Sequence, residues 1–248
     1  MAAELVLFFL LTLLSEILGT VGGFGSSLFF VSVAQFFFPF QAVLALTGLL
    51  HVFSNTAKLV FFWRTIDKKL LLWLGISSAV CAVAGAMLLR WVELEYAKLV
   101  LSLFLIGFSL FMLFTPSFKV NNTLRNAVGG GALAGFLAGF VGTGGAVRGL
   151  VLASFQLEKN MLIGTSAAID FAVDLLRSLV YLDSNFLPDE LLPVLPLLLV
   201  AAFGGSYLGK LIVNRISQTL FRKVLLSLVF LLGVLMLVKE WLTLCQSC

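Results

Sequence analysis

Two apolar segments of the chain, residues 41–63 and residues 160–182, each carry three polar side chains at helical spacing. The three positions are i, i+4 and i+7, so a helix would present all of them on one face. A constant offset of 119 positions relates the two sets, which are His51, Asn55 and Lys58, then Asp170, Asp174 and Arg177. These matched stripes predict one polar site built from two helices.

The ionisable side chains at these positions indicate a site for a small anion. A charge at the centre of a bilayer costs roughly 2.5–3.5 kcal/mol on insertion scales, so such residues face a cavity or a partner. Lys58 and Arg177, together with Arg148 from a third apolar segment, would form a positive centre. Arginine binds oxyanions through paired N–H groups, and helix N-termini offer free backbone N–H groups to the same ligand.

The predicted site residues come from the two stripes and from two glycine-rich runs. The predicted substrate-binding residues are Thr47, His51, Asn55, Lys58, Arg148, Ser166, Arg177, Gly23, Gly25, Gly144 and Gly145. The candidates for proton coupling are the acidic residues Asp170 and Asp174, with Glu16, which precedes the first glycine run.

Some of these residues have an alternative interpretation. Asp174 and Arg177 also fit a structural ion pair between helices, and His51 also fits a histidine whose hydrogen bonds are satisfied inside a core. An enzyme is disfavoured because His51 is the single histidine and lies in no H-E-x-x-H motif. We therefore predict no catalytic residues, no metal and no cofactor.

The composition places these segments in a lipid bilayer. Hydrophobic residues make up 61% of the 248 residues and charged residues only 11%, whereas soluble domains average about 45–50% and 25%. The apolar runs are roughly 20 residues or longer, which matches the bilayer core, and runs of that length cross as helices. The net charge of +4 then reflects membrane orientation rather than nucleic-acid binding.

Eight apolar blocks divide the chain into two similar halves. The blocks are 3–38, 41–63, 70–90, 97–115, 127–157, 160–182, 190–213 and 219–241. The first and fifth are too long for one plain span, and glycine runs at 19–25 and 139–145 interrupt them. Paired glycine-broken segments point to a transporter site, although glycines also permit close helix packing. We predict two repeats, 1–118 and 119–248, in one membrane domain.

The loop charges predict that the two repeats are inverted. The loops after the second, fourth and seventh blocks are basic, and the loop after the sixth is acidic and has no Lys or Arg. Basic loops lie in the cytoplasm. All loops fall on their expected sides only if each repeat has a re-entrant hairpin followed by three transmembrane helices. Both termini would then face outward from a multi-pass protein of the cell membrane, with a bacterial inner membrane as the expected one, and a homo-oligomer is compatible with this arrangement.

Several segments resemble a known family. Each glycine run is followed by an apolar limb and then by Thr-Gly-Leu-Leu (47–50) or Thr-Ser-Ala-Ala (165–168), and W-R-T-I-D-K-K (63–69) precedes the third block. Over residues 5–238 this order resembles the sulfite exporter TauE/SafE family. The resemblance implies a permease for sulfur-containing anions such as sulfite, sulfoacetate or other organosulfonates.

The expected activity is anion transport by alternating access around the central site. Each negative charge that leaves a negative-inside cell gains about 2.3 kcal/mol per 100 mV, so export of an anion needs no coupling. Uptake would need a coupled ion, and His51, Asp170 and Asp174 are residues that could carry protons. A passive anion channel and a proton-coupled uptake permease for an organic anion therefore stay open as alternatives.

Overall fold

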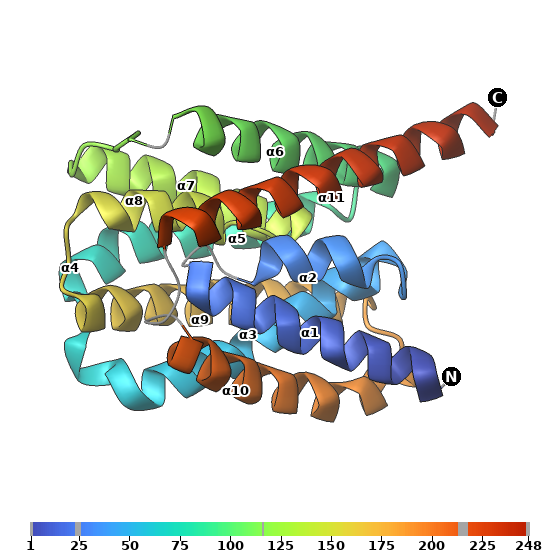
Figure 1. The fold of residues 1–248 in the computed structure, drawn as a ribbon, viewed down its shortest axis with the longest axis horizontal. Coiled ribbons are helices and arrows are strands. Elements are labelled where there is room, and N and C mark those ends of the chain that lie inside the picture. The colour runs from blue at the N-terminus through green and yellow to red at the C-terminus, as the bar shows by residue number, and fades with distance from the viewer. Residues whose placement is uncertain (1, 23–25, 116, 213–217, 247–248) are drawn as a thin grey trace.

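The described residues of the computed structural model, 2–22, 26–115, 117–212 and 218–246, contain helices and connecting turns and no strand. The helices run along the long axis of the molecule, and both chain termini lie at the same end (Figure 1). Among the described residues, six helical segments are long and apolar enough to cross a membrane: Glu4–Val21, Phe40–Val60, Lys68–Leu88, Leu94–Phe114, Leu124–Val141 and Asp189–Ile212. The predicted class, an all-helical polytopic membrane protein, is therefore confirmed.

The first half of the chain begins with a long helix and a short one. Its helices are α1 (Ala2–Gly22), α2 (Ser27–Ala34), α3 (Phe40–Phe62), α4 (Lys68–Leu70), α5 (Ile76–Leu88) and α6 (Leu94–Phe114). A 3₁₀ turn (Trp63–Thr65) follows α3, and a π-helical segment (Leu71–Gly75) joins α4 to α5. Asp67 begins α4 by accepting hydrogen bonds from two backbone N–H groups of that helix.

The second half repeats this order of long and short helices. Its helices are α7 (Leu124–Val141), α8 (Gly145–Ser154), α9 (Lys159–Asp183), α10 (Leu195–Ile212) and α11 (Gln218–Gln246), and a 3₁₀ helix (Asp189–Val194) precedes α10. Thr123 begins α7 by accepting from the N–H of Asn126 at 3.2 Å. The helix α9 is 25 residues long, and its middle carries the predicted polar stripe.

The predicted interruption of the fifth apolar block is present. Helix α7 ends at Val141, Gly142 has a φ of +80°, and α8 begins at Gly145. A left-handed residue at this position ends the helix and suits glycine. In the first block, α1 ends at Gly22 and α2 begins at Ser27. The predicted site residues Gly23 and Gly25 lie outside the described residues.

Each of these interruptions produces a helical hairpin. The first hairpin (α1 and α2) and the second hairpin (α7 and α8) each pack a short limb against a long one. The short limbs have 8 and 10 residues, or about 12 and 15 Å of helix, so neither can cross a core of about 30 Å. The start of each short limb therefore lies inside the helix bundle.

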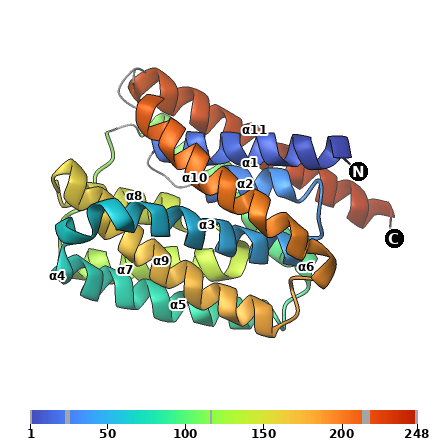
Figure 2. The ribbon, with the colours of Figure 1, turned by 90° about the horizontal axis from the view of Figure 1, so that it is seen from below.

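The packing partners of the two halves correspond. Helix α1 packs on α10, and α7 packs on α5; α3 packs on α9, and α6 packs on α11. These are the pairs that an exchange of the two predicted repeats would map onto one another. Matched helices such as α3 and α9 run in opposite directions (Figures 1 and 2). The inverted repeat remains a prediction, and this pattern of contacts supports it.

Exposed aromatic side chains lie near both ends of the bundle. Trp91 and Tyr96 lie at the end that contains the α5–α6 turn, and Trp63 and Trp73 lie near α4 at the opposite end. Trp91 is the most exposed of the four, at 87%. Tryptophan and tyrosine are enriched at the two membrane–water interfaces. Their positions fit a bundle that crosses the bilayer along its long axis.

Glycines bring helix backbones into direct contact at two places. On α7, a side chain at Gly135 would lie 2.0 Å from the carbonyl oxygen of Ser78 on α5, and one at Gly139 would lie 1.9 Å from that of Ala82. On α10, a side chain at Gly205 would lie 2.4 Å from Cβ of Glu16 on α1. Such contacts are typical of membrane helices. They determine how close each hairpin lies to the rest of the bundle.

The contact between α5 and α7 generates a prediction of stability. Replacing Gly135 with alanine should destabilise the protein by about 1–3 kcal/mol, because the added methyl group meets the backbone of α5. Gly129, on the same helix, faces open space, with no neighbouring atom within 4 Å of the point that a Cβ would occupy. Gly129→Ala should therefore be neutral or slightly stabilising. Thermal unfolding in one detergent would measure both variants, and equal melting temperatures would contradict this packing.

The placement of loops at opposite ends of the bundle also predicts which of them lie on each side of the membrane. Single cysteines would be placed at Lys68 and at Asp189, in a background without Cys81, Cys245 and Cys248. An impermeant thiol reagent added to intact cells should label position 189 and leave position 68 unlabelled, because the positive-inside rule predicts that the basic loops lie in the cytoplasm. Labelling of position 68 after the membrane is opened is the control. Labelling of both positions from outside would contradict the predicted topology.

Candidate functional site

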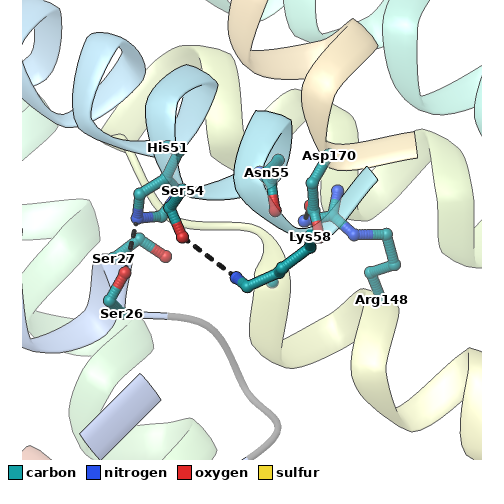
Figure 3. A pocket seen from close by; sticks show the side chains of 9 residues that line it. Ser26, Ser27, His51, Ser54, Asn55, Lys58, Arg148 and Asp170 are labelled. Carbon is teal, nitrogen blue, oxygen red and sulfur yellow. Dashed lines mark hydrogen bonds and ion pairs between the residues drawn. The ribbon is translucent and has the colours of Figure 1, made fainter. Parts of the chain in front are cut away.

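A small polar cavity lies where the short limbs of the two hairpins meet α3 and α9 (Figure 3). It is lined by Ser26, Ser27, His51, Ser54, Asn55, Lys58, Gly145, Arg148 and Asp170. Its volume is about 30 Å³, and one water needs roughly 10–15 Å³ on the same measure. Five of the predicted binding residues and one predicted proton carrier therefore line one cavity.

One face of α3 supplies nearly half of this lining. His51, Asn55 and Lys58 occupy the predicted stripe, and Ser54 lies beside them on the same face. Sequence reasoning missed Ser54, although its position at i+3 from His51 was the signal for it. Thr47 lies on the same helix but outside the lining, where its hydroxyl donates to the carbonyl oxygen of Val43 at 2.6 Å.

Glu16 of α1 accepts hydrogen bonds from two of the lining residues. Its Oε1 accepts from the Ser26 hydroxyl, and its Oε2 accepts from the Ser54 hydroxyl at 2.9 Å. The Lys58 ammonium in turn donates to the Ser54 oxygen at 3.0 Å. A hydrogen-bonded chain thus joins Lys58 to Glu16, whose side chain is buried. The two serine partners of Glu16 were not predicted.

His51 lies between two carboxylates that come from different halves of the chain. Its Nε2 is 2.9 Å from the Ser26 hydroxyl oxygen and 4.0 Å from Oε1 of Glu16. Its Nδ1 is 3.6 Å from Oδ2 of Asp174. The ring therefore connects α1 and α2 to α9, which is a more specific environment than that of an ordinary core histidine.

Arg177 forms an ion pair rather than lining the cavity. Its Nε donates to Oδ1 of Asp174 at 2.8 Å, and its Nη1 donates to the carbonyl oxygen of Ala138 at 3.0 Å. Asn55 completes the surroundings of the carboxylate by donating to Oδ2 of Asp174 at 3.3 Å. The side chain of Arg177 is 1% exposed. A ligand role for Arg177 remains a prediction, and this geometry favours the structural alternative.

Arg148 forms an ion pair with Asp170, but most of its N–H donors have no described hydrogen-bond partner. Its Nη2 contacts Oδ1 of Asp170, while Ser166 donates to the other oxygen of that carboxylate at 3.1 Å. Within the described residues, Nε and Nη1 of Arg148 are buried without a hydrogen-bond partner. The residue is 5% exposed, and its guanidinium borders the cavity (Figure 3). Buried donors of a charged group are costly to leave unpaired, so the site is prepared for an acceptor.

The two short limbs both begin at the cavity. Ser27 is the first residue of α2, Gly145 is the first residue of α8, and both belong to the lining. Each helix start directs partial positive charge toward this point. The limbs also contact each other through the hydroxyls of Ser27 and Thr143, 3.2 Å apart. Gly144, beside Thr143, packs against the Ala134 carbonyl and leaves no space for a side chain.

A comparison with known protein families decides the class of the protein. A family model described as Sulfite exporter TauE/SafE matches residues 8–236. The chain belongs to the sulfite exporter TauE/SafE family. It is therefore a multi-pass membrane transporter, and the resemblance drawn from the glycine runs and the W-R-T-I-D-K-K segment is confirmed. A search of the curated proteins finds no match to the chain.

The ion pair in this TauE/SafE protein generates a prediction for Arg177. Arg177→Gln should destabilise the protein by about 3–5 kcal/mol, because it leaves the buried Asp174 carboxylate uncompensated. The double variant Asp174→Asn, Arg177→Gln should recover most of that loss, because no charge remains unpaired. Thermal unfolding of the two single variants and of the double variant measures the coupling energy between the two side chains. Strict additivity of the two single effects would show that the two side chains do not act as a pair.

Proposed function

We propose that this TauE/SafE transporter carries small sulfur-containing anions, such as sulfite or organosulfonates, with Lys58 and Arg148 as the main ligands. The observation that carries the proposal is the pair of unpartnered Arg148 donors beside a cavity. The free N–H groups of Nε and Nη1 lie on different edges of the buried guanidinium, and each can donate a charge-assisted hydrogen bond to an oxyanion. Asp170 contacts Nη2, the nitrogen between those two edges, and holds the side chain in place.

The other donors around the cavity extend this match. The ammonium of Lys58 has three N–H bonds, and its described hydrogen bond, to Ser54, uses one of them. The backbone N–H groups at the starts of α2 and α8 add further donors. Three oxygens of a sulfite or sulfonate group would then each meet a positive donor, which is the pattern that a trigonal oxyanion requires.

Alternating access follows from how the two halves share this site. The lining combines α2 and α3 of the first half with α8 and α9 of the second. Rocking of one half against the other would thus open the site to one side and close it to the other. A cavity of about 30 Å³ holds roughly two or three water molecules, so sulfite would displace that water and a larger organosulfonate would require the walls to move apart.

Export is the proposed direction when the anion accumulates inside the cell. A passive channel remains the closest alternative, and the two differ in how flux depends on concentration. A carrier must rebuild its binding site in every cycle, so sulfite efflux from proteoliposomes should saturate. A channel would instead show flux that rises linearly with concentration, and that result would contradict alternating access while leaving the anion site intact.

The ligand roles can be tested by binding of sulfite to the purified protein. Lys58→Gln and Arg148→Lys should each weaken sulfite binding by about ten- to a hundred-fold, because each removes a charge-assisted contact or the planar pair of donors. The matched control is Arg90→Gln, which removes an arginine that pairs with Asp183 at the surface and should leave binding unchanged. Calorimetric affinities equal to wild type in both site variants would refute the assignment.

A further inference from the structure

The hydrogen bonds of Ser26 determine which nitrogen of His51 carries a proton. A serine hydroxyl has one hydrogen, and Ser26 donates it to Glu16. With Glu16 ionised, the Ser26 oxygen, 2.9 Å from Nε2 of His51, accepts a hydrogen bond from that nitrogen. Neutral His51 is then the Nε2–H tautomer, and its Nδ1 carries a lone pair.

When His51 is neutral, the lone pair of its Nδ1 faces another hydrogen-bond acceptor. Nδ1 of His51 lies 3.6 Å from Oδ2 of Asp174, and an ionised carboxylate has no hydrogen to offer. Two acceptors that face each other repel, whereas a proton on Nδ1 would convert the contact into an ion pair. The geometry thus places a nitrogen that can accept a proton beside a carboxylate oxygen.

The charged groups near His51 come from several helices. They are Glu16 of α1, Lys58 of α3, Arg148 of α8, and Asp170, Asp174 and Arg177 of α9. Helix α2 contributes the hydroxyls of Ser26 and Ser27, and α10 contributes Ser206, 3.3 Å from Ser54. The titratable groups of α10, Tyr207 and Lys210, are exposed.

Among these described groups, cations and carboxylates are equal in number. With His51 neutral and the other six groups ionised, the three cations balance the three carboxylates. A bound monoanion would leave the interior with one excess negative charge, and an uncompensated charge at this depth is strongly unfavourable. A proton from solvent, bound at Nδ1 of His51, restores the balance.

We propose that the transporter binds its anion together with one proton, which resides on His51, so that the empty and loaded sites carry the same charge. This inference rests on the anion site proposed above. It also changes the energetics of transport, because the membrane potential does no work on a neutral pair. A cell exterior one pH unit more acidic than the interior would balance about a tenfold excess of anion inside. Export would therefore require a larger internal excess than that.

The direct test counts the protons taken up when an anion binds. Methanesulfonate is the probe, because it stays a monoanion throughout the working range and any proton taken up belongs to the protein. Calorimetric titrations in buffers of different ionisation enthalpy should give an uptake near one proton per anion at about pH 8, where an ordinary histidine is neutral. The uptake should be smaller at about pH 5, because a solvent richer in protons loads the empty site before the anion binds. Affinity should accordingly fall as the pH rises.

The variant His51→Gln keeps a donor for Ser26 but has no second protonation site. Its methanesulfonate binding should neither release nor take up a proton at any of these pH values. Wild-type binding without proton uptake at about pH 8 would overturn the proposal, and so would an unchanged uptake in His51→Gln, since the proton would then reside on another group of the site. If the wild-type protein bound neither methanesulfonate nor sulfite, that result would instead refute the anion site itself.

A measurement on wild-type protein covers the case in which the variant does not fold. Methanesulfonate flux into proteoliposomes would be recorded with the membrane potential set by potassium and valinomycin. The initial rate should stay within about twofold over a change of roughly 100 mV, because no net charge moves. An imposed pH gradient of one unit should shift the final anion distribution by about tenfold. Flux that follows the potential and ignores the pH gradient would overturn the coupling.

Discussion

Ionised side chains inside a helix bundle in lipid need compensation where they lie, and this requirement governs the arrangement of the central helices. Removal of two charges from water costs several kcal/mol for each ion, and only close partners offset that cost. Arg177 therefore forms an ion pair with Asp174, and Arg148 forms one with Asp170. The ammonium of Lys58 reaches a carboxylate through Ser54, since it comes from the same helical face as that serine. These links join α1 to α3 and α8 to α9, and the contact between His51 and Asp174 joins the two pairs into one electrostatic unit.

The glycines make this unit possible because, without side chains, they allow neighbouring helix backbones to approach closely. Helix α10 approaches α1 closely enough at Gly205 to contact Cβ of Glu16, and this packing holds the carboxylate toward α3. On the other side of the molecule, α7 lies directly on α5 and carries the turn from which α8 begins. Backbone contacts of this kind vary little with side-chain motion, so the charged groups are held on a rigid frame.

Much of the site could be predicted from sequence because it depends on local periodicity. The stripe of His51, Asn55 and Lys58 follows from the helical repeat, and the break before Gly145 follows from a run of glycines in an over-long apolar block. The partners of Glu16 could not be predicted, since they depend on how α1 crosses α3. The pairing of Arg177 was also ambiguous, because a spacing of three residues from Asp174 permits both a salt bridge within the helix and a ligand that points away.

The hydroxyls of Ser27 and Thr143 form the polar contact where the two hairpins meet. A neutral hydrogen bond of this type contributes only about 0.5–1.5 kcal/mol, which is within a few multiples of thermal energy. Separation of the hairpins at this point therefore costs little by itself. In the proposed alternating access, the rate at which the halves exchange their orientation would instead be set by the larger helix–helix interfaces around the hairpins. Turnover should consequently respond more to the thickness and fluidity of the surrounding lipid than to the identity of these two hydroxyl groups.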